Sequence, residues 1–339
     1  MKRHYNNFDF LRFLFAIFVI ITHSFALSGV GEEKEWLYAI TNRQLSFSGL
    51  GLSGFFVISG FFIYRSCERS RNLWDYLKKR VLRVFPGLLV VLVLSLLIVP
   101  FIYEGETSLL SNRSYWTYGP YNLSLYGFQG VISGVFDHHP YKSINGSLWT
   151  IRYEFSLYLA IALLFLVRKQ KRLIVALVCV VLLVMMFLFH FALDQVGGAE
   201  IAGMVGVHIL NLGGFFVVGT LLATLDFEKW NSLLLVGVSF VLILVSIHLD
   251  FFITTKHLLL PLVVLGIGFI PLKGISSFSK YGDASYGIYI YAFPIQQLLL
   301  YFLKPSILVF ILSSMSLAII FGYLSWHLIE KKALELKSK

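Results

Sequence analysis

Long apolar stretches separated by short polar segments dominate this chain. Counting stretches of about 17–25 residues, the length that crosses a bilayer as an α-helix, gives about ten predicted spans. The pattern therefore predicts an all-α, polytopic membrane protein with a single membrane-embedded domain over residues 1–339. The predicted spans are approximately 8–29, 46–64, 86–103, 147–167, 172–190, 203–224, 230–248, 252–272, 284–303 and 306–328.

Composition supports the same class. Hydrophobic residues make up 58% of the chain and charged residues only 14%, whereas charged residues form about 25% of an average soluble domain. The formal net charge of +10 could suggest nucleic-acid binding. However, the basic residues cluster in short runs between apolar stretches, which is the pattern that sets membrane orientation. We therefore expect membrane lipid as a partner and no nucleic acid.

The positions of the basic residues predict an N-in, C-in topology. The first apolar stretch has no cleavage site and is expected to remain as a membrane anchor. With the amino terminus in the cytoplasm, an even number of spans places most Lys and Arg residues on the cytoplasmic side. The basic segments on that side are Lys2 and Arg3, the run 65–83, the run 168–172, Lys273, Lys280 and the Lys-rich carboxyl-terminal tail.

The segment at about 72–85 is predicted to form a short amphipathic helix on the cytoplasmic surface. Asn72 is a suitable N-cap, and Pro86 is expected to start the next span. Arg80 and Arg83, three residues apart, share one face of this helix. Two interpretations follow: the arginines anchor the helix to lipid phosphates, or they bind the phosphates of a cytoplasmic ligand, because guanidinium groups bind phosphate bidentately.

The first predicted span carries two ionisable residues. Arg12 lies near its cytoplasmic end, and His23 lies eleven positions further on. At about 100° per residue, both side chains share one helix face, roughly 16 Å apart along the axis. An ionisable group at membrane depth is costly and indicates a functional site.

The fourth predicted span adds a carboxylate at a similar depth. Ser147, Thr150, Glu154 and Tyr158 are expected to form one polar stripe at helical spacing, with Glu154 about 10 Å from the outer end. A carboxylate beside His23 would be an acid–base pair or a structural ion pair. Arg152 offers Glu154 a local partner instead.

Three further features have two interpretations each. The small residues of the second span, around Gly54 and Gly60, indicate close helix packing or backbone contact with a ligand. The aromatic residues of the external loop at about 104–146 indicate a membrane-interface belt or a platform for sugar rings. His208 is a core residue or a functional one. No histidine has the spacing and carboxylate neighbours of a metal site, so no metal is expected.

Several motifs, taken in order, resemble the integral membrane acyltransferase-3 family. The resemblance spans nearly the whole chain, with one departure: many members carry a histidine two residues before the late proline, where this chain has Ala292. The matching motifs are Arg12 with His23, the Gly-rich stretch Phe55 to Phe61, Arg80 and Arg83 followed by Pro86, Asn145 to Glu154, and Ser285, Tyr286, Tyr289 and Pro294.

The resemblance implies an O-acetyltransferase of the bacterial cytoplasmic membrane, with acetyl-CoA as a co-substrate and no permanently bound cofactor. The acceptor would be a hydroxyl of a surface polysaccharide or of a lipid-linked oligosaccharide. His23 would act as general base, with Glu154 orienting it, and Arg12, Arg80 and Arg83 would bind the donor. The residues expected to hold sugar or thioester oxygens are Asn145, Ser147, Trp149, Thr150 and Tyr289.

Two alternatives use the same buried residues. A proton-coupled transporter or lipid-linked sugar flippase would also need buried His and Glu, but the sequence contains no detectable inverted repeat. A subunit that relays acyl groups to a partner enzyme would keep the arginines and need no sugar site. The sequence leaves the acyl chain, the glycan and the oligomeric state open.

Overall fold

The computed structural model describes residues 7–272 and 274–336, and this part of the chain is mostly helical. Its strands are the two-residue β1 (Glu200–Ile201) and β2 (Met204–Val205), paired as an antiparallel hairpin. The predicted all-α class is therefore confirmed. Lys2, Arg3 and Lys273, which contribute to the predicted orientation, lie outside the described residues.

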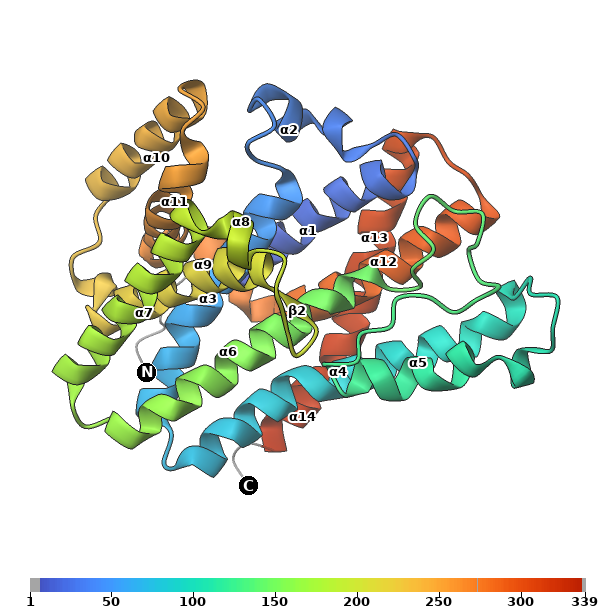
Figure 1. Cartoon of the computed structure of the whole chain (residues 1–339), viewed down its shortest axis with the longest axis horizontal. Helices are drawn as coiled ribbons and strands as arrows, with labels where there is room; N and C mark the ends of the chain where they lie inside the picture. Colours follow the sequence, from blue (N-terminus) through green and yellow to red (C-terminus); the bar gives the residue numbers. More distant parts are fainter. Residues whose placement is uncertain (1–6, 273, 337–339) are drawn as a thin grey trace. The chain divides into compact units, whose positions relative to one another are not determined.

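Each predicted span corresponds to an apolar helix (Figure 1). Among the described residues, eight helical segments are long and apolar enough to cross a membrane. Two of the ten predicted spans fall outside this set, because α10 has only 16 residues and the tyrosines and glutamines of α12 lower its hydropathy. The apolar helices are α1 (Phe8–Leu27), α3 (Phe47–Arg69), α4 (Leu73–Ile102), α6 (Ile151–Leu163), α7 (Lys171–Phe191), α9 (Gly206–Thr224), α10 (Leu233–His248), α11 (Phe252–Phe269), α12 (Ser285–Phe302) and α13 (Ile307–Ser325).

Short helical turns connect these elements. They are α2 (Trp36–Ile40), α5 (Arg113–Leu123), α8 (Leu193–Val196) and α14 (Lys331–Glu335), the 3₁₀ turns η1 (Glu32–Lys34), η2 (Leu109–Ser111), η3 (Gly146–Thr150), η4 (Leu164–Val167), η5 (Phe227–Lys229) and η6 (Ile275–Tyr281), and the π-helical turn η7 (Trp326–Glu330).

The predicted surface helix at 72–85 is not a separate element. It continues into the third span as the single helix α4, with Pro86 inside it. The Asn72 side chain does accept a hydrogen bond from the backbone N–H of Asp75, at 2.8 Å, as a helix start requires. Proline removes one backbone donor but is tolerated inside long apolar helices, so Pro86 did not begin a new one.

The chain divides into two compact units whose segments interleave along the sequence. The first comprises Met1–Phe15, Leu37–Leu77 and Tyr153–Asp283, and the second comprises Ala16–Trp36, Lys78–Arg152 and Ala284–Lys339. The helices α1, α4 and α6 each contribute residues to both units. His23 belongs to the second unit and Glu154 to the first.

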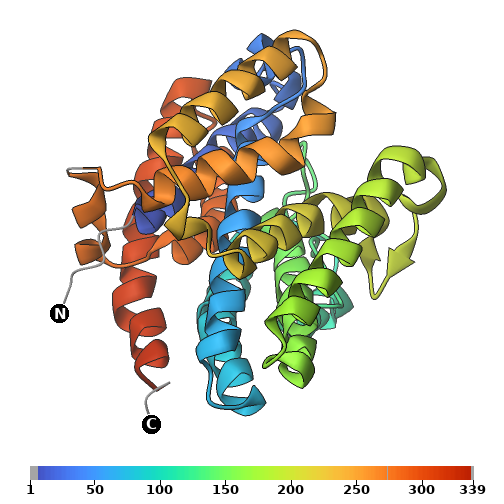
Figure 2. The same cartoon turned by 90° about the vertical axis from the view of Figure 1, so that its left-hand side faces the viewer.

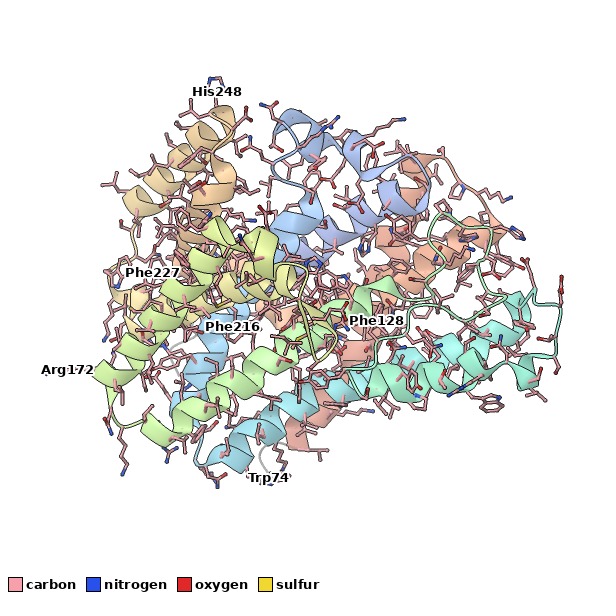
Figure 3. All side chains as sticks on the ribbon, viewed as in Figure 1. Trp74, Phe128, Arg172, Phe216, Phe227 and His248 are labelled. Carbon is pink, nitrogen blue, oxygen red and sulfur yellow. The ribbon has the colours of Figure 1, made fainter. Side chains whose placement is uncertain are left out.

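In the first unit, α9 packs closely against α3 and α7, as Figures 1 and 2 both show. A Cβ at Gly60 of α3 would collide with the carbonyl oxygen of Phe216 (labelled in Figure 3), and a Cβ at Gly219 would collide with that of Val57. Only glycine therefore allows the two backbones to approach this closely. Of the two interpretations of the small residues in this span, the structure supports helix packing at Gly60.

An ionic cluster joins three helix ends of the first unit. The Asp226 carboxylate, just after α9, accepts hydrogen bonds from Arg65 of α3 at 2.8 Å, Lys171 of α7 at 3.0 Å and Lys229 of η5 at 2.9 Å. The bonds from Lys229, Arg65 and Lys171 hold the pKa of the Asp226 carboxyl well below its usual value. These residues lie in loops predicted to be cytoplasmic, where the cluster fixes the ends of the helices.

In the second unit, α12 and α13 form a tight antiparallel pair. A Cβ at Gly287 of α12 would lie only 2.9 Å from the Cα of Gly322 of α13, so the two glycines set the closeness of this crossing. Towards the other end of the pair, Leu27 of α1, Phe293 of α12 and Phe310 of α13 form a buried apolar cluster. This cluster places the end of α1 beside α12.

Candidate functional site

The part of α1 that carries His23 is fixed on both sides of the histidine. The Gln296 amide of α12 donates to the carbonyl of Ile20 at 3.0 Å and to the hydroxyl of Ser24 at 2.8 Å. On the other side, the Thr22 hydroxyl donates to the carboxylate of Glu35. Thr22, Ser24, Glu35 and Gln296 are all fully buried, so these contacts hold α1 in one position around His23.

The His23 ring lies edge-on to Phe293, with ring centroids 5.3 Å apart. Its Nδ1 is buried and has no hydrogen-bond partner among the described residues. Leaving a buried polar atom unsatisfied costs about 1–3 kcal/mol. The Nδ1 atom of His23 is therefore suited to accept or donate a hydrogen bond when a polar group of a substrate arrives beside the Phe293 ring.

The predicted substrate-binding stretch forms a polar network against α12. The Asn145 amide donates to the carbonyl of Ile290 at 2.8 Å, and its side-chain oxygen caps the N–H of Ser147 at 3.1 Å. The Tyr289 hydroxyl lies 2.7 Å from the Thr150 hydroxyl and donates to the carbonyl of Ser147 at 3.0 Å. Four of the five predicted residues therefore meet in one place.

This network adjoins the His23 environment through Phe293. A Cβ at Gly146 would lie 2.5 Å from the Phe293 ring, so glycine allows the 145–150 segment to pack against the same ring that contacts His23. Within this segment, the Ser147 hydroxyl oxygen is buried and has no partner among the described residues. Trp149, the fifth predicted residue, is half-buried in the same 3₁₀ turn.

The predicted polar stripe from Ser147 to Tyr158 spans a change of helix type. Ser147 and Thr150 lie in η3 and belong to the second unit, whereas Glu154 and Tyr158 lie in α6 and belong to the first. The change from 3₁₀ to α geometry at residue 151 breaks the regular 100° spacing on which the single stripe depended.

Glu154 is held by two hydroxyl groups of its own unit. Its Oε1 accepts a hydrogen bond from Ser59 of α3 at 2.8 Å and another from Tyr158 of α6. The Tyr158 carbonyl in turn accepts from the buried Tyr76 hydroxyl at 2.8 Å. These bonds fix the position of the Glu154 side chain between α3 and α6. The pairing of Glu154 with His23 stays a prediction.

Arg152 does not belong to the same unit as Glu154. Its guanidinium lies 5.7 Å from the centroid of the Phe128 ring, within the second unit (Phe128 is labelled in Figure 3). A cation over an aromatic face gains electrostatic stabilisation from the ring. The structure thus gives Arg152 a contact of its own in the second unit.

The three predicted donor-binding arginines are distributed over both units. Arg12, in the first unit, pairs with Asp9 at 3.4 Å and with Asp283 at 3.5 Å. A phosphate bound by Arg12 would therefore share the guanidinium with two carboxylates. Arg80 and Arg83 lie one turn apart on α4 in the second unit, and both are half-buried.

Sequence reasoning missed several residues that the structure places around the predicted ones. Ser59 was part of a matching motif but had no assigned role, and its place opposite Glu154 depends on how α3 meets α6. Gln296 and Glu35 gave no usable signal, because neither belongs to a recognised motif and their partners lie elsewhere in the chain. Phe293 resembled any other apolar residue of its span.

Other sequence features have mixed outcomes. The described residues contain no cluster of three or more His, Cys, Asp or Glu side chains that could hold a metal ion. Ala292 is buried in α12. In the external aromatic loop, Tyr118 is fully buried, whereas Trp116 and Tyr121 are about half exposed. For those exposed rings, the membrane-belt and sugar-platform interpretations both stay predictions.

Comparison with known proteins assigns the chain to a class. Residues 5–327 match a family described as an acyltransferase domain. The chain is 26% identical to an O-acetyl transferase of Shigella phage Sf6, over 97% of this chain and 96% of that protein. It is 31% identical to Nodulation protein 10 of Rhizobium leguminosarum bv. viciae, over 50% of this chain and 47% of that protein. No solved structure matches. Because the family match covers nearly its whole length, the chain belongs to the integral membrane acyltransferase-3 family and is a multi-pass membrane acyltransferase.

Proposed function

We propose that the protein transfers an acetyl group from cytoplasmic acetyl-CoA to a hydroxyl of a cell-surface glycan or of its lipid-linked precursor, in a bacterial cytoplasmic membrane. The observation that carries the proposal is His23, whose buried Nδ1 lacks a partner among the described residues beside the Asn145–Tyr289 network. The similarity to a phage O-acetyl transferase over nearly the full length of both chains supports the choice of an O-acetyl product.

Donor binding is assigned to the cytoplasmic arginines. Coenzyme A carries several phosphates, and Arg80 and Arg83 on adjacent turns of α4 offer two guanidinium groups to them. Arg12 would contribute from the start of α1, eleven residues before His23 on the same helix. The thioester would extend from the phosphates towards His23.

Acyl transfer is assigned to His23 and the network beside it. His23 takes the proton of the acceptor hydroxyl as its oxygen attacks the thioester carbonyl carbon. A new C–O ester bond forms, the C–S bond breaks, and the thiolate of CoA receives the proton from the imidazolium. In this proposal the hydroxyl groups of Ser147, Thr150 and Tyr289 donate hydrogen bonds to the carbonyl oxygen as it gains negative charge, which requires Thr150 and Tyr289 to release the Ser147 carbonyl that they contact now. A two-step path through an acetyl-His23 intermediate uses the same residues.

The test compares matched histidine and arginine variants of the purified protein in lipid nanodiscs. CoA binding is measured directly, and acetyl release from labelled acetyl-CoA is measured with and without a panel of methyl glycosides as acceptors. His23→Ala is compared with His248→Ala, and Arg83→Ala with Arg172→Ala. His248 and Arg172 are exposed residues that serve as controls (Figure 3).

His23→Ala is expected to bind CoA normally and to lose about 10²–10⁴-fold in turnover, the usual contribution of a general base. Arg83→Ala is expected to weaken CoA binding, and both controls to behave as wild type. A wild-type protein that does not bind CoA would overturn the proposal. A protein that binds CoA but transfers acetyl only in the presence of a second protein would instead support the relay-subunit alternative.

A further inference from the structure

Glu330, close to the carboxyl end of the described chain, is a buried carboxylate. A carboxylate followed by two lysines at the end of an apolar helix, as Glu330 is here, normally faces water. In the structure, Glu330 is only 2% exposed, whereas Lys331 and Lys332 beside it are exposed. A buried carboxylate is costly unless it is paired and hydrogen-bonded. The family match ends at residue 327 and does not include Glu330.

The π-helical turn η7 brings Glu330 next to Ser325. Five residues at about 100° each would place these side chains roughly 140° apart around a regular α-helix. In a π-turn, residues five apart are neighbours, and the Ser325 hydroxyl donates to Glu330 Oε1 at 2.8 Å. π-turns are rare and occur frequently at functional sites. The turn thus directs the carboxylate inward.

Two glycines make room for the carboxylate. A Cβ at Gly287 of α12 would lie 3.0 Å from Glu330 Oε1 and 2.9 Å from Gly322 Cα. Any larger residue at Gly287 would have to displace Glu330 or separate α12 from α13. The carboxylate is therefore held from one side by Ser325 and from the other by the helix crossing, and it has little freedom to turn towards solvent.

Arg83 of α4 supplies a positive charge beside this carboxylate. Arg83 Nη1 lies 4.0 Å from Glu330 Oε2, and the Arg83 guanidinium lies 5.9 Å from the centroid of the Tyr286 ring. Tyr286 is itself fixed, because its hydroxyl donates to the carbonyl of Val84 at 2.9 Å. The Arg83 side chain remains 23% exposed. The guanidinium is thus set between a fixed carboxylate and a fixed ring.

We infer that Glu330 is a positioning residue for donor binding, which holds the Arg83 guanidinium in the orientation that binds a CoA phosphate. The inference rests on the proposed function, because it takes Arg83 as a donor-binding residue. Holding a long side chain in place before the ligand arrives removes part of the ordering cost of binding. The π-turn and the two glycines lie far from Arg83 in sequence. By fixing Glu330, they help to orient Arg83 for donor binding.

The test measures binding of CoA alone and the steady-state kinetics of acetyl-CoA in nanodiscs. Glu330→Gln is nearly isosteric and removes the charge, while Ser325→Ala removes the bond that directs the carboxylate. Glu335→Gln, five residues further on and exposed, is the matched control. Arg83→Gln and the double variant R83Q/E330Q complete a double-mutant cycle. If Glu330→Gln fails to fold, Ser325→Ala takes its place in the cycle.

Glu330→Gln is expected to raise the Kd for CoA and the KM for acetyl-CoA by about 3- to 10-fold, with kcat at saturating donor within about 2-fold of wild type. Ser325→Ala should give a smaller rise, and Glu335→Gln none. In the Arg83→Gln background, Glu330→Gln should add nothing further. A Glu330→Gln protein that binds CoA as well as or better than wild type, or whose effect is undiminished without Arg83, would overturn the inference. If the wild type itself does not bind CoA, the proposed function fails first.

Discussion

Replacing Ser59 by Ala tests how Glu154 is held. Ser59 of α3 donates a 2.8 Å hydrogen bond to Glu154 Oε1, and Tyr158 donates to the same oxygen from α6. Ser59→Ala removes one of these two donors and leaves the other in place. If the ionised carboxylate takes part in the reaction, the loss of a donor should be visible in turnover.

The magnitude follows from the charge of the acceptor. A hydrogen bond to a charged group contributes about 1.5–3 kcal/mol, and at about 1.4 kcal/mol per factor of ten this corresponds to roughly 10- to 100-fold. Because Tyr158 still donates to the same oxygen, we expect a reduction in kcat nearer the lower end, about 10-fold. Tyr158→Phe should give a reduction of similar size.

The assay is acetyl release from labelled acetyl-CoA in nanodiscs, with thermal unfolding measured in parallel. Ser53→Ala, six residues earlier on α3, is the matched control, since the Ser53 hydroxyl donates to the carbonyl of Gly49 in its own helix at 2.7 Å. The control should keep wild-type turnover. Glu154→Gln and the double variant S59A/E154Q show whether Ser59 acts through the carboxylate.

Two results would refute this reasoning. The first is wild-type turnover for Ser59→Ala in a folded protein. The second is a full further loss when Ser59→Ala is added to Glu154→Gln, because residues that act as one unit should not contribute independently. Either result would leave the hydrogen bonds of Glu154 with a role in stability alone.

Three further predictions concern stability, pH and the fixing of α1. Gly60→Ala should lower the free energy of unfolding by about 1–3 kcal/mol in a denaturant titration, because its Cβ has no room at the α3–α9 crossing, whereas Gly237→Ala, with nothing within 4 Å, should be neutral or slightly stabilising. The depressed pKa of Asp226 contributes stability that is present above its unfolded pKa of about 4 and is lost as pH falls towards the lower folded value. Asp226→Asn should therefore flatten the fall of Tm below about pH 5, and an unchanged slope would contradict this. Gln296→Leu should lower kcat by about 10-fold or more with little effect on CoA binding, because it frees the helix turn that carries His23. Parallel effects on kcat and CoA affinity would contradict that assignment.

Helix boundaries show where local sequence was sufficient and where it was not. Asn72 marked a true helix start, since its capping bond depends only on neighbouring residues. The prediction that Pro86 starts a new helix was wrong. Whether a proline ends a helix or lies within it depends on what surrounds the carbonyl that it leaves without a hydrogen bond. The predicted stripe from Ser147 to Tyr158 begins in a 3₁₀ turn and ends in an α-helix, and this change of geometry at residue 151 was not part of the regular 100° spacing.

In the candidate site, too, some features were predictable from the sequence and others depended on tertiary contacts. The network of Asn145, Ser147, Thr150 and Tyr289 was anticipated as a set, although its hydrogen-bond pairing was not. Glu330 carried no signal of burial, because on composition alone a carboxylate next to two lysines at a helix end normally faces water. Its burial depends on the π-turn and on the close approach of Gly287 to Glu330. Neither can be predicted from the order of apolar and polar residues.

By itself, the sequence determined that the chain is an all-α membrane protein, that Arg12 and His23 share a helix, and that Arg80 and Arg83 share another. These properties depend on hydropathy and on the 3.6-residue period, which neighbouring residues fix. Only the tertiary structure decided that Ser59 holds Glu154, that Gln296 fixes the helix turn of His23, and that Glu330 faces Arg83. Each of these contacts joins segments far apart in the chain, and which polar groups meet depends on how the helices pack.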